Sequence, residues 1–296
     1  MHSKSVIAAL SFFVALTAPS LAQTPVRALA EILEQSPASD WRSVEQENLL
    51  YMELPAGRVI IELAPDYAPR HAENIRALSR ANYFNGSAIV RSQDNYVVQW
   101  GRDEGDAAAL GEAHPTLQGE FDRPRAGVRI TRLHDRDTYA REVGFANGFP
   151  AAGEHGRTWL AHCYGMVGAG RGDTPDSGNG GELYVVIGHA PRHLDRNVTL
   201  VGRVLVGMEL LSIMPRGTGA LGFYEDAAQR TAIRSIRIGS DLPASEQLPL
   251  EALRTDSATF LDVIESRRTR RESWFLQPTG RINLCNVPLP VRLRAS

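Results

Sequence analysis

Two short apolar runs, at residues 88–90 and 96–98, restrict the fold of this 296-residue chain more than any other feature. A brief polar segment separates them, and this pattern predicts two short neighbouring strands. Arg91 directly follows the first run and Gln99 directly follows the second. A guanidinium is almost never fully buried without a partner. Arg91 is therefore either a strand-end side chain that reaches solvent or a salt bridge, or a functional residue.

The sequence around these runs resembles the cyclophilin family of peptidyl-prolyl isomerases. Family members carry Gly-Ser, Phe-His-Arg, an aromatic residue and Gln-Gly-Gly-Asp in this order. The residues that match here are Gly86-Ser87, Ile89-Val90-Arg91, Tyr96 and Gln99-Trp100-Gly101-Arg102-Asp103. Further matches in the family's order occur at residues 57–63, 68–69, 73–75, 165–169, 179–185, 194–195, 200–204 and 207–208. The resemblance covers about residues 49–239.

The resemblance implies a mainly β fold, with one closed eight-stranded antiparallel β-barrel capped by two helices. Many short apolar runs agree with such a barrel. The apolar periodicity predicts the two helices at residues 69–82 and 208–214. Outside the domain at 49–239, the pattern predicts a helical lead-in at residues 23–48 and an extension at residues 240–296.

In such a barrel the interior is filled by side chains, so a substrate binds on the outer face. The resemblance gives Arg91 the role of catalytic hydrogen-bond donor, and Gln99 orients it and holds the peptide backbone. The proline ring would lie in an apolar pocket near the rim of the groove, lined by Tyr96, Val97, Tyr184 and Leu194, with Glu182 and His193 beside it. No metal or cofactor is required, and the histidines near residue 160 lack the spacing of zinc ligands.

Several positions depart from the family's pattern. Glu182 replaces a Gln, His193 replaces a Trp common in eukaryotic members, and Val198 replaces a His. Glu182 could either align Arg91 or sequester it. Two functions therefore remain open: a peptidyl-prolyl isomerase acting on exported or folding proteins, and a catalytically weak periplasmic peptide-binding or chaperone module. The partners expected are proline-containing peptides and unfolded protein clients, and we expect a monomer.

Residues 1–22 have the pattern of a secretory signal peptide, with Lys4, an apolar core at 6–18 and a small residue, Ala22, before the expected cut. A membrane anchor is the competing interpretation, but this core is short for a bilayer of ~30 Å. We therefore expect a soluble periplasmic protein with no membrane insertion after cleavage. The net charge of −2 gives no reason to expect a nucleic-acid partner.

An insertion at about residues 122–159 mixes arginines with acidic residues. This composition predicts a solvated, self-neutralising surface excursion, although long excursions can also be functional. In the extension, Asp256 can cap a helix, and we expect Phe260, Ile264, Trp274 and Phe275 to pack on the barrel. The arginines at the end of this helix suit its negative dipole end; they are Arg267, Arg268, Arg270 and Arg271.

The chain contains two cysteines, Cys163 and Cys285. An exported protein with an even number of cysteines can form a disulfide. Two buried free thiols fit the sequence equally well, so the sequence leaves both states open.

Overall fold

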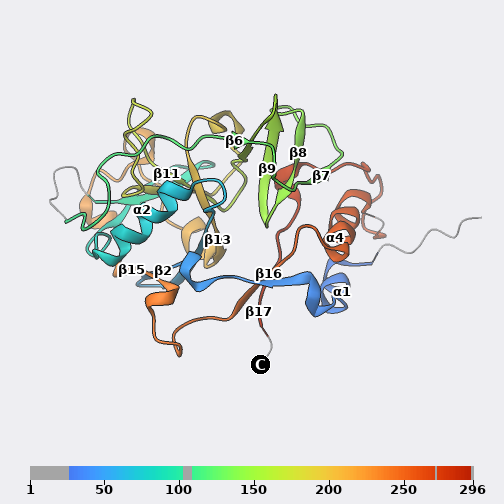
Figure 1. The fold of residues 1–296 in the computed structure, drawn as a ribbon, viewed down its shortest axis with the longest axis horizontal. Helices are drawn as coiled ribbons and strands as arrows, with labels where there is room; N and C mark the ends of the chain where they lie inside the picture. The colour runs from blue at the N-terminus through green and yellow to red at the C-terminus, as the bar shows by residue number, and fades with distance from the viewer. Residues whose placement is uncertain (1–26, 103–108, 271, 295–296) are drawn as a thin grey trace, which may run out of the picture.

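The computed structural model describes residues 27–102, 109–270 and 272–294. The expected signal peptide at residues 1–22 and the motif residue Asp103 lie outside these ranges. The described chain is mainly β, with a curled nine-stranded sheet, a five-stranded sheet and a three-stranded sheet (Figure 1). Within the described ranges, none of the helices has both the length and the apolar content that crossing a bilayer requires.

The nine-stranded sheet is antiparallel throughout and runs in the order β14-β4-β5-β12-β11-β13-β3-β2-β15. Its strands are β2 (Leu49–Leu54), β3 (Gly57–Leu63), β4 (Ala88–Ser92), β5 (Val97–Gly101), β11 (Met166–Ala169), β12 (Leu183–Val186), β13 (Leu200–Val206), β14 (Thr231–Ala232) and β15 (Ser235–Ile238). β2 and β3 follow one another in the chain and pair as an antiparallel hairpin.

The two outer strands of this sheet, β14 and β15, are consecutive parts of one segment. β14 pairs with β4, while β15 pairs with β2 on the opposite side of the sheet. Between them the N–H of Ile233 donates to Ser87 O at 2.9 Å, and the N–H of Arg234 donates to Glu53 O at 2.9 Å. One segment thus bridges both sides of the curled sheet. The predicted closed eight-stranded barrel is matched only roughly, because nine strands are formed and two of them share this segment.

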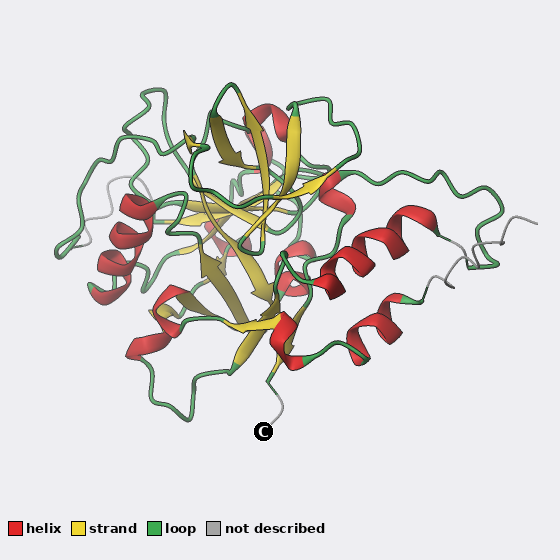
Figure 2. Cartoon of the chain, turned by 45° about the vertical axis from the view of Figure 1, so that its right-hand side comes forward, coloured by secondary structure: helices red, strands yellow, loops and turns green. Residues whose placement is uncertain are grey.

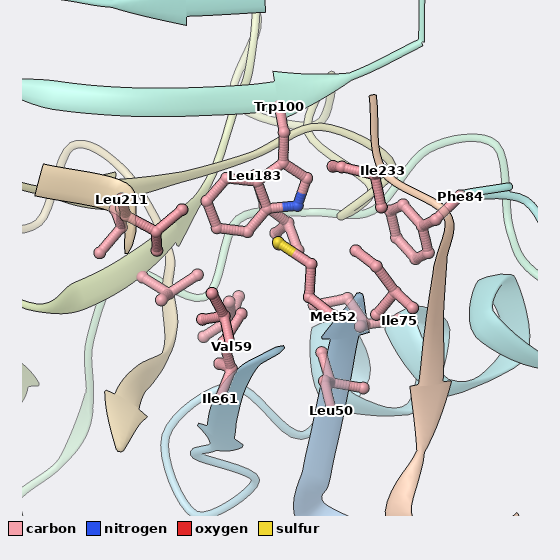
Figure 3. Close-up of a cluster of buried hydrophobic side chains, with 14 of the residues drawn as sticks. Leu50, Met52, Val59, Ile61, Ile75, Phe84, Trp100, Leu183, Leu211 and Ile233 are labelled. Carbon is pink, nitrogen blue, oxygen red and sulfur yellow. The ribbon is translucent and has the colours of Figure 1, made fainter. Parts of the chain in front are cut away.

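Two helices cover the interior of the curled sheet, α2 (Pro69–Arg80) and α3 (Met208–Ser212). Pro69 occupies the first turn of α2, where its missing N–H costs nothing. Ile75 of α2 and Leu211 of α3 are fully buried against the sheet. Figure 3 shows both side chains in one cluster with Trp100, which is fully buried. The interior is therefore packed, which leaves the outer face of the sheet for ligands.

The insertion forms a folded layer, so the prediction of a solvated excursion is wrong. Its sheet runs in the order β6-β10-β9-β8-β7. Phe145 on β8 and Trp159 on β10 are buried, and Phe145 meets Phe260 of the extension edge to face at 5.0 Å. The strands are β6 (Arg123–Pro124), β7 (Thr131–Leu133), β8 (Glu142–Ala146), β9 (Phe149–Glu154) and β10 (Arg157–Leu160). On these strands the charged side chains are partly or fully exposed, while the apolar side chains supply a second hydrophobic core.

The lead-in and the extension meet in the three-stranded sheet. Strand β16 (Leu250–Leu253) lies between β1 (Trp41–Ser43) and β17 (Val291–Leu293). Two helices pack beside this region, α1 (Leu29–Glu34) and α4 (Ala258–Thr269) (Figure 1).

Two sequence predictions about the extension need correction. Ser257, not Asp256, caps α4, because its Oγ accepts from the N–H of Phe260 at 3.1 Å. Phe260 and Ile264 are buried in a core that the extension shares with the insertion and with Met166 and Leu200 of the curled sheet, so their expected packing on the barrel is confirmed. Trp274 is 81% exposed and therefore does not pack on the barrel.

Cys163 and Cys285 form a disulfide across 122 residues of sequence. Cys163 lies just before β11, and Cys285 lies in a 3₁₀ turn, Leu284–Asn286. The alternative of two free thiols is therefore ruled out for this structure, and the extension is covalently attached to the barrel.

Candidate active site

Strand register places Arg91 and Gln99 opposite one another on the curled sheet. The two residues are direct partners in the β4–β5 pair, and a bulge between Ile89 and Arg91 sets this register. Arg91 Nη1 donates to Gln99 Oε1 at 2.9 Å. The two candidate catalytic residues, eight positions apart in sequence, are thus in direct contact.

Further contacts hold the Arg91 guanidinium in one position. Its Nε donates to Leu221 O at 2.7 Å, and its Nη2 donates to Gln93 Oε1. Its Cζ lies 5.7 Å from the ring centre of Tyr96 and 5.3 Å from that of Phe223. Burial lowers the pKa of Arg91, but an arginine remains charged in proteins. The result is a fixed, charged hydrogen-bond donor.

A glycine-rich segment that the sequence analysis did not single out contributes to this arrangement. It contains the 3₁₀ turn Ala220–Gly222 and then Phe223, which forms an isolated bridge with Arg91. Gly222 has φ +79°, and a Cβ there would lie 2.7 Å from the Cα of Gln93. Only glycine allows the two backbones to approach this closely. The glycines in this segment were therefore the sequence signal that could have indicated its contact with the strand of Arg91.

Glu182 reaches the Arg91 site through Gln99. Gln99 Nε2 donates to Glu182 Oε1, and Gln99 is itself buried. Strand β12 pairs with β5 next to this contact. Among the hydrogen bonds of the described residues, Glu182 meets Gln99 and not Arg91. The carboxylate therefore fixes the amide with its oxygen toward Arg91, which favours alignment over sequestration.

An apolar cluster lies beside Arg91 on the same face of the sheet. Val97, Tyr184 and Val186 are buried in it, and the half-buried Tyr96 and Val198 pack against them. The His193 ring stacks on Tyr96 with a centroid distance of 6.2 Å and an interplanar angle of 2°. Leu194 is half-buried in the 3₁₀ turn Arg192–Leu194. Within the described chain, Leu194 is not among the side chains packed on this cluster.

A buried hydrogen-bond chain supports Tyr184 from below. The Tyr184 hydroxyl is 2.8 Å from His162 Nε2, and His162 Nδ1 is 2.9 Å from Asp195 Oδ1. Because a carboxylate only accepts, Nδ1 carries the imidazole proton and Nε2 accepts from the hydroxyl. Burial lowers the pKa of His162 and raises that of Tyr184, so both groups are neutral near pH 7. The ring of Tyr184 is thereby held in place.

The chain continues into the insertion through Arg192. Arg192 Nε donates to Asp195 Oδ2 at 2.5 Å, and Nη1 and Nη2 donate to Asp137 Oδ2 and Oδ1 at 3.0 and 3.3 Å. The three side chains are almost completely buried. Burial alone raises the pKa of Asp195, but its bond to His162 and the charge of Arg192 outweigh this and lower it. Sequence reasoning missed this network, because Asp137, His162 and Tyr184 are far from one another in the chain.

A cleft of about 680 Å³ adjoins this network and separates the insertion from the 3₁₀ turn that carries His193. Its walls include Tyr139 and Trp159 from the insertion and His193 and Asn197 from the barrel side. In the part of the chain that the structure describes, no three His, Cys, Asp or Glu side chains are grouped to hold a metal ion.

Comparison with known proteins agrees with this geometry. The family model described as "Cyclophilin type peptidyl-prolyl cis-trans isomerase/CLD" matches residues 49–237. A probable peptidyl-prolyl cis-trans isomerase of Brucella suis biovar 1 is 26% identical over 188 residues, covering 60% of this chain and 76% of the relative. The human peptidyl-prolyl cis-trans isomerase-like 3 is 26% identical over 155 residues, covering 52% of this chain and 74% of the relative.

A solved structure is similar over most of the chain. The cyclophilin AquaCyp293 from Hirschia baltica superposes with a TM-score of 0.67 at 25% identity, covering 86% of this chain and 95% of that one. The family model spans well over half of the sequence. The chain therefore belongs to the cyclophilin-type peptidyl-prolyl cis-trans isomerases.

Proposed function

We propose that Arg91 is the catalytic donor with which this isomerase accelerates rotation about X-Pro bonds. The observation that carries the proposal is the fixed guanidinium, held by Gln99 beside the apolar cluster of Val97 and Tyr184. A guanidinium has five N–H groups, and three hydrogen bonds to the described chain engage one on each nitrogen. Two N–H groups are thereby left to face a bound peptide.

The chemistry follows from the amide bond. Its rotation has a barrier of ~18–20 kcal/mol because resonance must be broken. In the twisted state the prolyl nitrogen becomes pyramidal and recovers a lone pair, which can accept a hydrogen bond. A donor fixed beside that nitrogen binds the twisted state more tightly than the planar one, and only such selective binding raises the rate. Arg91 has the required charge and rigidity.

The neighbouring residues receive supporting roles in this proposal. Gln99 aligns Arg91, and the remaining N–H of its amide holds the peptide backbone. Glu182 positions that amide through its hydrogen bond. Tyr96, Val97, Tyr184 and Val198 receive the proline ring, and His193 lies at the pocket rim on the face of Tyr96.

We further propose that the enzyme acts on proteins that fold after export to the periplasm. The apolar run before Ala22 has the pattern of a signal peptide. The Cys163–Cys285 disulfide supports an oxidising compartment, because such bonds persist mainly outside the cytosol. Proline isomerisation limits folding there as elsewhere, so unfolded exported chains are the expected clients.

A peptide assay tests the catalytic proposal. The chain from Gln23 onward should accelerate cis-to-trans conversion of an Ala-Pro peptide, and Arg91→Ala should lower kcat/KM by roughly 10²-fold or more, as for other fixed transition-state donors. Arg80→Ala is the matched control, because Arg80 is a half-exposed arginine of α2 paired with Glu47 and Asp241. No acceleration by the unmodified protein would refute isomerase catalysis, and an unchanged rate in Arg91→Ala would refute the role of Arg91.

The cleft between the insertion and His193 supports a second candidate function, the holding of extended client chains. Its aromatic and charged walls can contact residues that flank the proline. If holding is the main activity, Arg91→Ala should still keep an unfolded client in solution. Loss of client holding in Arg91→Ala, together with loss of turnover, would instead assign both to one site.

A further inference from the structure

The segment that follows α4 exposes large apolar side chains. Figure 2 shows it at the outer edge of the molecule, where the chain leaves the end of α4 and runs beyond the sheets before it turns back. Trp274 is 81% exposed and Leu276 is 92% exposed. They are the two most exposed large apolar side chains in the described ranges. Apolar groups gathered in this way mark binding surfaces more often than isolated exposed residues do.

Cations lie beside these apolar groups. The Arg270 guanidinium is 5.1 Å from the ring centre of Phe275, and the Phe275 and Trp274 rings meet edge to face at 4.9 Å. Arg270 Nε donates to Arg267 O at 3.2 Å, which brings the two arginines together. We call Arg267, Arg270, Trp274, Phe275 and Leu276 the α4-end surface.

The arginines of this surface differ from their neighbour Arg268. Arg268 is neutralised by Asp135 and Glu265, at 2.8 and 2.7 Å. Over the described residues, no carboxylate lies within ion-pair distance of Arg267 or Arg270, and Arg267 Nε is buried without a hydrogen-bond partner. Burial and the charge of Arg270 lower the pKa of Arg267, while the carboxylate of Glu272 acts in the opposite direction. Arg267 and Arg270 therefore remain available to an anionic partner.

We propose that the α4-end surface binds anionic phospholipid membranes. Trp274 and Leu276 would enter the interfacial region, where tryptophan rings are favoured. Arg267 and Arg270 would contact the phosphate headgroups, since basic groups are attracted to an anionic leaflet. A second copy of the chain fits less well, because a symmetric contact places these arginines against themselves.

Tryptophan fluorescence can test this proposal directly. The chain has four tryptophans, and Trp41, Trp100 and Trp159 are all buried. A change in emission on binding therefore reports on Trp274. With the chain from Gln23 onward, which retains every described residue, we expect a blue shift with vesicles of phosphatidylglycerol and phosphatidylcholine in equal parts. Pure phosphatidylcholine vesicles should give little shift, and 0.5 M salt should weaken binding.

Sedimentation with the same vesicles measures how much the apolar side chains and the arginines each contribute to membrane binding. Trp274→Ser with Leu276→Ser should weaken binding about tenfold or more. Arg267→Gln with Arg270→Gln should weaken it by roughly fivefold per arginine. The matched control is Arg129→Gln with Arg141→Gln, which removes equal charge from two highly exposed arginines of the insertion. Peptide turnover and thermal unfolding should be unchanged in the Trp274 and Leu276 variant, which shows that it remains folded.

Three results would overturn the proposal. The first is binding that does not depend on anionic lipid, and the second is equal loss of binding in the control variant. The third is sedimentation without vesicles, with a mass that rises with protein concentration and falls in Trp274→Ser with Leu276→Ser. That result would assign the surface to contact between copies of the chain. None of these results depends on Arg91, so this test and the test of catalysis fail independently.

Discussion

Replacing Asp137 by Asn should remove the ion pair between the insertion and Arg192 while the turn at residues 137–140 keeps its shape. Asp137 Oδ1 accepts the N–H groups of Tyr139 and Ala140 at 2.8 and 3.0 Å, and an Asn oxygen can accept both. The amide Nδ2 that replaces Oδ2 is a donor, so the hydrogen bond from Arg192 Nη1 is lost together with the charge that faces Arg192, whose side chain is 4% exposed. After the substitution Asp195 is the only carboxylate that neutralises Arg192 within the described network.

The size of the effect follows from this burial. Removing one partner of a buried ion pair costs about 3–5 kcal/mol. Because Asp195 remains, we expect the lower end, a loss of about 3 kcal/mol in the free energy of unfolding. At roughly 2–4 °C per kcal/mol, Tm should fall by about 6–12 °C. Since the Arg192–Leu194 turn carries His193, KM for the Ala-Pro peptide should rise more than kcat falls.

Urea denaturation followed by circular dichroism measures the free energy of unfolding, and kinetics with the Ala-Pro peptide measure KM and kcat. Arg141→Gln is the control within the insertion, because the Arg141–Glu154 pair is on the surface and such pairs contribute about 0–1 kcal/mol. Equal unfolding free energies for Asp137→Asn and Arg141→Gln, with KM unchanged, would show that the insertion does not support the pocket.

Three further predictions concern other parts of the site and its support. Burial holds the pKa of His162 below its ordinary value, so the unfolded chain takes up a proton at a higher pH than the folded protein does. The unfolding free energy should therefore fall as pH drops below about 6.5. Denaturation at several pH values measures this dependence, and His162→Asn should reduce its slope. Gly222→Ala places a methyl against the Gln93 backbone at a positive φ, so Tm should fall by a few degrees and turnover per folded molecule should fall as well; equal turnover per folded molecule would show that the segment around Gly222 does not position Arg91. Cys163→Ala with Cys285→Ala opens a loop of 122 residues and should cost roughly 2–5 kcal/mol of stability by denaturation, whereas an unchanged midpoint would mean that noncovalent packing alone secures the extension.

Local patterns predicted the parts of the fold that depend on neighbouring residues. The β2–β3 hairpin and helix α2 follow from alternation, a turn and Pro69, all of which act within a few residues. The contact between Arg91 and Gln99 was also predictable through the family resemblance, because strand pairing across a short turn leaves few registers.

Contacts between distant segments could not be predicted in this way. His162, Tyr184 and Asp195 come from three separate segments, and nothing near any one of them signals the others. The insertion was misjudged because its strands are short and rich in small residues, and because its apolar positions are buried in a core to which distant residues such as Phe260 and Leu200 contribute. Trp274 was misplaced for the opposite reason, since its apolar character alone does not show whether a partner is within reach.

The three-stranded sheet can form only late in the synthesis of the chain. Strand β1 is made early, yet its partner β16 lies more than 200 residues later, and β17 follows later still. A growing chain therefore carries residues 41–43 unpaired while all strands of the curled sheet are completed. Only a chain that has reached residue 293 can close this small sheet, so its closure marks a molecule whose catalytic layer has already been made in full.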